Sequence, residues 1–196
     1  VEQLARRLFL KPEELDALRV LSPKYRIHRK RKSFGKYRII AVPTPELAKV
    51  QRRLLDKLIA PIPISPHVYG GVKRRNHVRH AWVHRAAVSA YVVDLKDAFQ
   101  HGNRERMRTV LKQSSFNDET AEAILDLTTH ERYGLPQGAP TSNAMFNLLC
   151  RHLDAELFFF AESHGMRYTR YVDELVLSTR YDISPEWREE IKGIIT

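Results

Sequence analysis

Apolar and polar positions follow helical spacing in several parts of this chain. The apolar residues between Leu47 and Leu58 recur every three or four positions, behind Thr44-Pro45-Glu46, which has the features of a helix start. Residues 104–113 and 118–129 have similar patterns, and Pro12 with two following acids opens a short helix. A broad apolar face from Met145 to Phe160 predicts one long helix.

Other stretches have the composition of strands. Residues 37–42 and 88–95 are rich in β-branched and aromatic side chains, and Gly35 lies where a hairpin would turn before the first of them. Residues 167–172 and 175–179 alternate, with only Asp173-Glu174 between them, so they predict a hairpin with both acids in its turn. The run from Gly134 to Pro140 holds two Pro and two Gly, which excludes helix and central strand.

The composition indicates which class of binding partner to expect and excludes several kinds of site and segment. The 196 residues suffice for one domain or two small ones, and 33 Lys and Arg against 23 Asp and Glu give a net charge of +10. This balance favours a polyanionic partner such as nucleic acid, with a solubility surface as the alternative. The one cysteine, Cys150, excludes an internal disulfide and a Cys-rich zinc site, and no apolar run is long enough to span a bilayer. Because the chain starts at Val1 and stops at Thr196 inside a predicted helix, we expect a fragment.

Three acids stand next to apolar strand segments. Asp94 follows Tyr91-Val92-Val93, and Asp173 and Glu174 lie between two apolar runs. A carboxylate at the end of a buried strand is costly unless a base or a metal pairs with it. Taken singly, each acid is more often a turn residue or an ion-pair partner, but a cluster of three carboxylates suits a hard divalent cation such as Mg²⁺.

Three segments together resemble the sequence motifs of reverse transcriptases. Val93-Asp94-Leu95-Lys96-Asp97-Ala98-Phe99 resembles motif A, Leu135 to Asn143 (LPQGAPTSN) resembles motif B, and Tyr171-Val172-Asp173-Glu174 resembles motif C. Their order and separations also fit, and Arg31 to Pro43 resembles the fingers strands that hold the incoming triphosphate. Within that family, Asn76 to His80 is similar to the retron Asn-Ala-x-x-His signature, with His77 in place of Ala, and Tyr168 to Tyr171 is similar to the retron context of motif C.

The resemblance implies an α+β fold of the right-hand polymerase type, with fingers plus a palm whose antiparallel sheet is backed by helices. It assigns residues 1–88 to the fingers, 89–103 to the palm with motif A, 104–133 to fingers helices and 134–196 to the palm with motifs B and C. The thumb is expected to be absent from this chain.

The resemblance also implies two-metal phosphoryl transfer with Mg²⁺, or Mn²⁺ in its place. Asp94 and Asp173 match the principal metal ligands, the backbone carbonyl of Leu95 a further one, and Glu174 stands where the family usually has Asp. Phe99 matches an aromatic steric gate that favours deoxynucleotides, with plain core packing as the alternative. Gln137 and Gly138 match the turn under the templating base pair. The triphosphate-binding candidates are Arg31, Lys32, Lys36 and Arg38.

A second basic patch is the candidate surface for nucleic acid, with a solvated face as the alternative. Its residues are Lys73, Arg74, Arg75, Asn76, Arg79 and His80. His77, His80 and His84 fall on one helix face, but no acid or Cys pattern accompanies them, so a solvated or phosphate-facing helix is favoured over a zinc site.

The implied function is an RNA-directed DNA polymerase that extends a DNA or RNA primer with dNTPs on an RNA template. A retron-like enzyme would use a structured non-coding RNA, in the bacterial cytoplasm and without a membrane, and a role in phage defence rests on analogy alone. Two alternatives stay open. One is a catalytically impaired RNA-binding scaffold, favoured by Glu174, the missing thumb and the altered signature. The other is a group II intron maturase-type enzyme.

Overall fold

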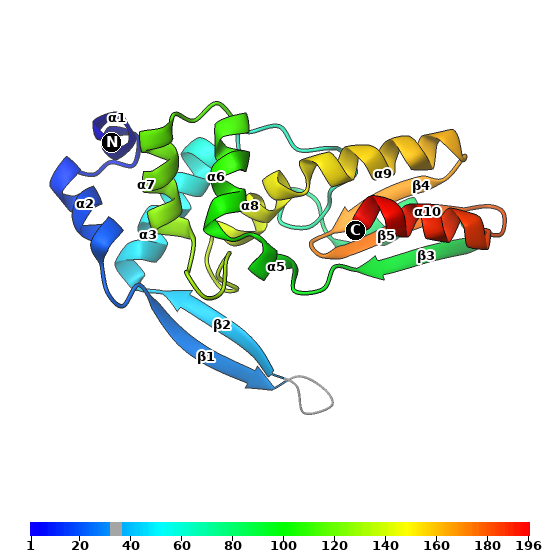
Figure 1. The fold of residues 1–196 in the computed structure, drawn as a ribbon, viewed down its shortest axis with the longest axis horizontal. Helices are drawn as coiled ribbons and strands as arrows, with labels where there is room; N and C mark the ends of the chain where they lie inside the picture. Colours follow the sequence, from blue (N-terminus) through cyan, green and yellow to red (C-terminus); the bar gives the residue numbers. More distant parts are fainter. Residues whose placement is uncertain (32–36) are drawn as a thin grey trace. The chain divides into compact units, whose positions relative to one another are not determined.

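The computed structural model describes residues 1–31 and 37–196, which form two compact units (Figure 1). The first unit comprises residues 1–62 and 99–146, and the second comprises residues 63–98 and 147–196. Each combines helices with antiparallel strands, which confirms the α+β class. The described residues contain no helix with the length and apolar character that a membrane span requires.

The first unit is mainly helical. Asn side chains cap two of its helices, since Asn103 accepts a hydrogen bond from the Arg106 amide and Asn117 from the Thr120 amide. Its core includes the buried Gln51, whose amide donates to the Leu127 carbonyl over 2.7 Å. The helices are α1 (Glu2–Arg7), α2 (Pro12–Val20), α3 (Pro45–Leu54) continued by the π-helical turn η2 (Leu55–Ile59), α6 (Arg104–Gln113) and α7 (Asp118–Thr128).

A two-stranded ribbon also belongs to the first unit. Strands β1 (Tyr25–Arg31) and β2 (Tyr37–Pro43) pair antiparallel, with Tyr25 opposite Pro43. Apart from Tyr25, the side chains of β1 are exposed, so the ribbon carries its basic residues into solvent. Three predictions lie outside the described residues. They are the triphosphate-binding candidates Lys32 and Lys36 and the hairpin turn at Gly35.

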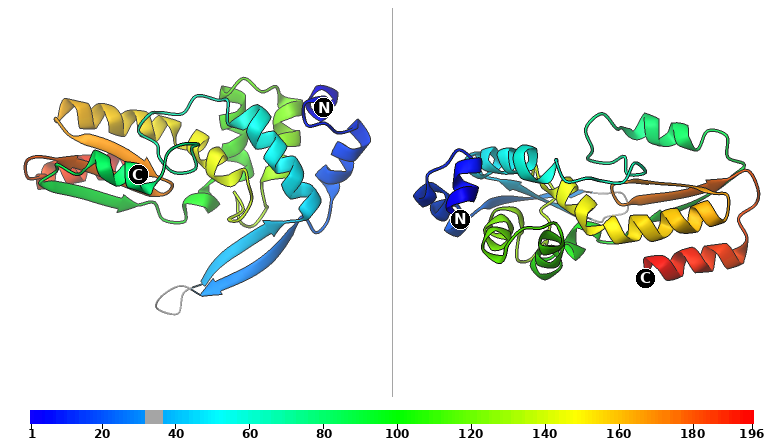
Figure 2. Two further views of the ribbon diagram at one scale, coloured as in Figure 1. Left: turned by 180° about the vertical axis from the view of Figure 1, so that it is seen from behind. Right: turned by 90° about the horizontal axis from the view of Figure 1, so that it is seen from above.

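The second unit contains the sheet that carries the predicted acids. Its strand order is β3 (Ser89–Asp94), β5 (Glu174–Thr179) and β4 (Arg167–Tyr171), all antiparallel. Helices α9 (Arg151–Ser163) and α10 (Pro185–Ile195) cover one face over an apolar core, and α4 (His77–Val83) lies on the other face (Figure 2). The sheet and its helices therefore form one packed body around the motif C hairpin.

Two local predictions were wrong. The predicted long apolar helix is two helices, α8 (Ser142–Leu149) and α9, separated at Cys150. The prediction missed this break because the apolar spacing continues across it. Burial raises the pKa of the Cys150 thiol to about 12. The hairpin turn consists of Val172 and Asp173, and Glu174 is already the first residue of β5, paired with Tyr171.

The two compact units divide the chain at other positions than the predicted fingers and palm boundaries, which stay a prediction. Residues 63–88 pack with the sheet: Val68 bridges Arg170 beside β4, and the Tyr69 amide donates to the Arg170 carbonyl over 2.8 Å. Residues 134–146 belong to the first unit, together with α5 (Ala98–His101) from Phe99 onward. The membership of a segment in one unit or the other depends on contacts between residues far apart in the sequence, which local sequence patterns do not reveal.

Candidate active site at the turn end of the sheet

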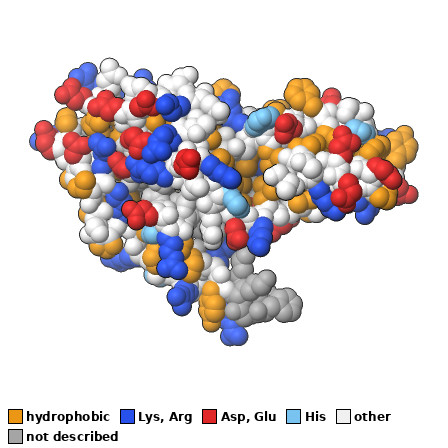
Figure 3. Space-filling view, viewed as in Figure 1, with side chains coloured by type: hydrophobic (Ala, Val, Ile, Leu, Met, Phe, Trp, Pro, Cys, Tyr) orange, Lys and Arg blue, Asp and Glu red, His pale blue; other side chains and the backbone are white. Residues whose placement is uncertain are grey.

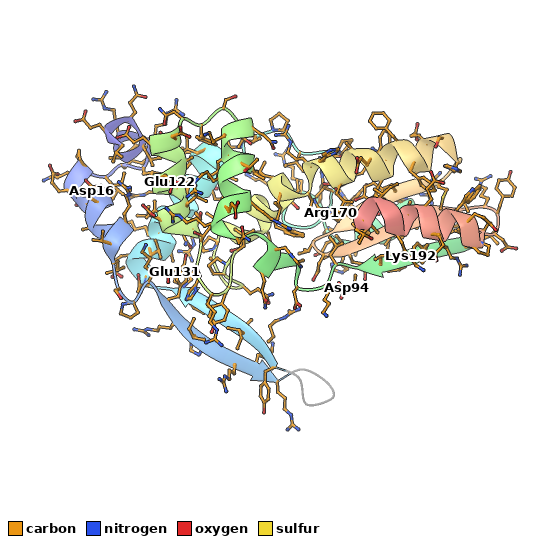
Figure 4. The ribbon with its side chains drawn as sticks, in the orientation of Figure 1. Asp16, Asp94, Glu122, Glu131, Arg170 and Lys192 are labelled. Carbon is orange, nitrogen blue, oxygen red and sulfur yellow. The ribbon has the colours of Figure 1, made fainter. Side chains whose placement is uncertain are left out.

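The strand register brings motif A next to motif C. Asp94, the last residue of β3, pairs with Glu174, the first residue of β5. The Leu95 amide then donates to the Asp173 carbonyl over 2.9 Å. Figure 4 shows Asp94 at the end of β3, at the same end of the sheet as Arg170. The acids that the sequence singled out therefore lie at one edge of one sheet.

The environment of these acids differs from the predicted one. Asp94 and Glu174 are exposed and Asp173 is half-buried, so none bears the full cost of burial. Within residues 1–31 and 37–196, none of the three forms an ion pair, and the carboxylates of Asp94 and Glu174 leave the same face of the sheet. Two like charges opposite each other repel unless a cation lies near them.

The predicted cluster of three carboxylates is not assembled. Among the described side chains, no group of three His, Cys, Asp or Glu could hold a metal ion. The backbone separates the two acids of motif C, because Asp173 occupies the turn whereas Glu174 is the first residue of β5. The donor chemistry still fits Mg²⁺: the oxygens of Asp94 and Glu174 are accessible and have no cationic partner in the described part of the chain.

The motif C turn has a constrained backbone. A two-residue hairpin turn requires a positive φ at its first position, and Val172 adopts φ 59° there. A β-branched residue rarely takes this conformation. Gly70 lies directly against the turn, because a Cβ built on it would be 2.3 Å from the Val172 nitrogen. The close approach of these two segments therefore depends on a residue without a side chain at position 70.

A buried polar network lies under the turn, and sequence reasoning did not identify it. The Arg170 guanidinium forms two hydrogen bonds to the Asp154 carboxylate and one each to Asn147 Oδ1 and the Val172 carbonyl. Tyr168 also donates to Asp154 over 2.7 Å. Burial acts to lower the pKa of Arg170, but the hydrogen bonds and charge of Asp154 outweigh it and raise the pKa. The signal in the sequence was an Arg in the middle of a predicted core strand.

The residues of the second basic patch differ in exposure and in their contacts, which corrects part of the nucleic-acid prediction. Arg75 donates to the carbonyls of Ser65 (2.7 Å) and Val68 (2.5 Å), so its side chain closes a loop. Asn76 caps α4 by accepting from the Arg79 amide. Lys73, Arg74 and Arg79 are exposed, and Arg79 Nη1 also donates to the Arg74 carbonyl over 2.8 Å.

The histidines of this region are structural too. His80 is only 6% exposed, with its ring 5.7 Å from the Tyr171 ring, so it packs against motif C and does not face a phosphate. The ring nitrogens of His84 lie 2.6 Å from the hydroxyls of Ser178 and Thr169. Burial lowers the pKa of His84 to about 4, so its ring is neutral at pH 7. The predicted solvated or phosphate-facing helix is therefore wrong for these two side chains, and only His77 is exposed.

The ribbon separates the two described candidates for triphosphate binding. Arg38 pairs with Lys30, whereas Arg31 pairs with Tyr37, so the side chains of Arg31 and Arg38 leave opposite faces. Lys30, which was not among the predicted triphosphate-binding residues, shares the face of Arg38. All three cations are exposed, and Figure 3 shows Lys and Arg side chains at the surface of the ribbon. Lys30 and Arg38 can thus contact a single anion from the same face of the ribbon, whereas Arg31 and Arg38 lie on opposite faces.

The remaining motif residues lie in the first unit. Phe99 is 8% exposed and stacks on Phe146 with ring centroids 5.2 Å apart, the environment expected from core packing. The Gln137 carbonyl accepts from the Ala41 amide over 2.8 Å. Gly138 has φ 119°, and a Cβ there would lie 3.2 Å from the Ala41 oxygen. Gly138 therefore allows a close approach between this turn and β2, and the predicted position under the templating base pair stays a prediction.

Comparison with known proteins extends these observations. The model of the family "Reverse transcriptase (RNA-dependent DNA polymerase)" matches residues 28–185. Retron Mx162 reverse transcriptase of Myxococcus xanthus is 33% identical over 161 residues, which cover 74% of this chain and 33% of that protein. Retron Ec86 reverse transcriptase of Escherichia coli is 30% identical over 159 residues, covering 80% and 49%. Retron Ec48 reverse transcriptase of the same species is 26% identical over 201 residues, covering 94% and 49%. The chain spans between a third and a half of the length of these curated relatives.

Proposed function

The chain belongs to the reverse transcriptase family, and we propose that it supplies the reacting carboxylates of a retron-type RNA-directed DNA polymerase with a right-hand arrangement. One observation carries this proposal: the register that places Asp94 opposite Glu174 and bonds the Leu95 amide to Asp173. In this interpretation the sheet unit is the palm and the unit with the ribbon is the fingers. The names of the relatives support the retron assignment over a maturase-type enzyme.

The residues that would hold divalent metal are the carboxylates of Asp94 and Asp173 and the carbonyl of Leu95, with Glu174 beside them. When bound, Mg²⁺ neutralises charge on the phosphates and favours the primer 3′-oxygen as a nucleophile. The proposed contribution of the chain is placement: the β3–β5 register sets Asp94 opposite Glu174, and Asp173 lies in the adjoining turn. Catalysis by positioning and charge needs no covalent step on the protein.

The cationic side chains define the proposed substrate contacts. We assign the triphosphate to the Lys30–Arg38 face of the ribbon and the backbone of the RNA template or the primer to Lys73, Arg74 and Arg79. Arg offers a planar fork that suits phosphate, and Lys offers a mobile point charge. A structured non-coding RNA is the template expected if the retron relationship extends to the partner.

Primer extension by the full-length protein tests the proposal. We expect extension of a DNA primer on an RNA template with dNTPs and Mg²⁺, inhibition by EDTA, and loss of extension in Asp94→Ala with unchanged nucleic-acid affinity. Asp182→Asn is the matched control, because Asp182 is an exposed acid beyond the opposite end of β5. Normal extension by Asp94→Ala would refute the site assignment.

One observation favours a second function, an RNA-binding scaffold with impaired chemistry. Glu174 replaces the usual Asp, and its longer side chain starts from the strand opposite Asp94. This alternative predicts tight RNA binding without extension at any Mg²⁺ or Mn²⁺ concentration. Measurable extension by the wild type would exclude it.

A further inference from the structure

We propose that Arg170 is a positioning residue, whose guanidinium fixes the peptide before Asp173 and thereby sets where the Asp173 carboxylate lies. This inference rests on the proposed function, because that function places Asp173 at the reacting site. Arg170 itself is fully buried on the core face of β4 and does not touch the substrate.

Hydrogen bonds hold both of the peptide planes that flank the Asp173 Cα atom. Arg170 Nη1 donates to the Val172 carbonyl over 2.8 Å. Because a peptide is planar, holding that oxygen fixes the plane that ends at the Asp173 Cα. On the other side, the Asp173 carbonyl accepts from the Leu95 amide over 2.9 Å. With both planes held, the main freedom left to Asp173 is its own side-chain rotamer.

The guanidinium is itself held in one orientation. Its Nε and Nη2 donate to the two oxygens of Asp154, each over 2.8 Å, and Asp154 lies on α9. Nη1 also donates to Asn147 Oδ1 over 3.0 Å, and the Asn147 amide donates to the Gly70 carbonyl over 2.9 Å. The planar Arg fork matches a carboxylate in two places at once, which a Lys ammonium does not do. These hydrogen bonds therefore connect helix α9, through the Arg170 guanidinium, to the motif C turn.

Burial argues for a directional role. Arg170 is 0% exposed and Asp154 is 1% exposed, and a buried ion pair is often no more stabilising than apolar residues of similar volume. An apolar side chain at this position would leave the Val172 carbonyl without this donor and the buried Asp154 without its cation. Val172 has the disfavoured φ of 59°, and such a conformation persists only where its surroundings fix it.

The test compares Arg170→Lys with Tyr168→Phe in the full-length protein. Tyr168→Phe removes a buried hydrogen bond to the same Asp154 but leaves the Arg170–Val172 hydrogen bond intact. It therefore controls for the loss of a hydrogen bond from the buried network while the turn keeps its contact with Arg170. Hydrogen exchange at the Leu95 amide measures whether the turn is held, independently of metal and activity. Primer extension gives kcat, and KM for dNTP, for each variant.

We expect Arg170→Lys to speed exchange at Leu95 about 10-fold and to lower kcat about 100-fold, the loss typical of a catalytic group misplaced by about 1 Å. KM should change little, and Tyr168→Phe should resemble the wild type in both readouts. Equal effects of the two variants, or wild-type exchange in Arg170→Lys, would overturn the inference in favour of a purely structural role.

The exchange measurement separates this inference from the proposed function. A wild type that extends no primer would refute the function, while faster exchange in Arg170→Lys alone would still establish that Arg170 holds the turn. If Arg170→Lys does not fold, Asp154→Asn takes its place in the same comparison. That variant keeps the side-chain shape but gives the guanidinium a single oxygen acceptor at this position.

Discussion

Replacing Gly70 by Ala should move the motif C turn, because the contact between Gly70 and Val172 leaves no room for a methyl group. The added Cβ would lie 2.3 Å from the Val172 nitrogen and 2.6 Å from its Cγ2 atom. Carbon atoms in contact settle at separations of about 3.5 Å, so one of the two segments must move by about 1 Å. The nearest atom is backbone, which a side-chain rotation does not relieve.

The magnitude follows from that displacement. Overpacking a dense site costs about 1–3 kcal/mol of folding free energy. A shift of about 1 Å at a catalytic group lowers kcat by about 100-fold, which corresponds to about 2.7 kcal/mol of barrier. We therefore expect Gly70→Ala to remain folded, with a lower Tm, and to extend primers about two orders of magnitude more slowly.

The assay is steady-state primer extension alongside thermal unfolding of the full-length protein. Gly193→Ala is the control, since Gly193 lies in α10 with no heavy atom within 4 Å of its added Cβ. This control should keep wild-type kcat and lose no stability, because Ala favours a helix over Gly. Wild-type kcat and Tm in Gly70→Ala would show that the Gly70–Val172 contact does not constrain the turn, and would refute the reasoning.

Two further predictions concern Glu174 and His84. Asp173→Glu should reduce extension more than Glu174→Asp, because Asp173 is held at both flanking peptides whereas Glu174 is an exposed strand residue; the reverse order of steady-state rates would contradict this. His84 has a pKa lowered to about 4 by burial, so the unfolded chain binds its proton more readily. The stability contributed by the neutral ring should therefore be complete above about pH 6.5 and decrease as pH falls towards 4. Tm measured across this range should fall less steeply in His84→Gln than in the wild type or in His28→Gln, which alters an exposed ring; equal slopes would contradict the assignment.

Local patterns predicted much of the fold. Residues 104–113 form α6 as expected, and Thr44 caps α3 by accepting from the Leu47 amide. Such elements depend on capping residues and apolar spacing that lie within a few positions of each other. The strands that carry Asp94 and the motif C hairpin were also predicted, because their apolar runs are short and are bounded by acids.

The parts that the sequence did not reveal depend on contacts between distant segments. Arg75 and Arg170 have the charge expected of phosphate ligands or surface residues, yet both donate to backbone carbonyls inside the second unit. The opposite facing of Arg31 and Arg38 follows from the β1–β2 register, which no single strand encodes. The strand register also determines that Asp173 lies in the hairpin turn and Glu174 in β5. The turn begins one residue earlier than the sequence pattern predicted.

The residue at the interruption between α8 and α9, Cys150, provides a chemical probe of how often the second unit opens. Cys150 is the one cysteine in the sequence, it is buried, and its thiolate is disfavoured at neutral pH. An alkylating reagent reacts with the thiolate, so modification should wait for an opening of the unit that contains Asp154 and Arg170. Pulsed alkylation with mass detection would therefore report how often this unit opens, without an added label and at a single site.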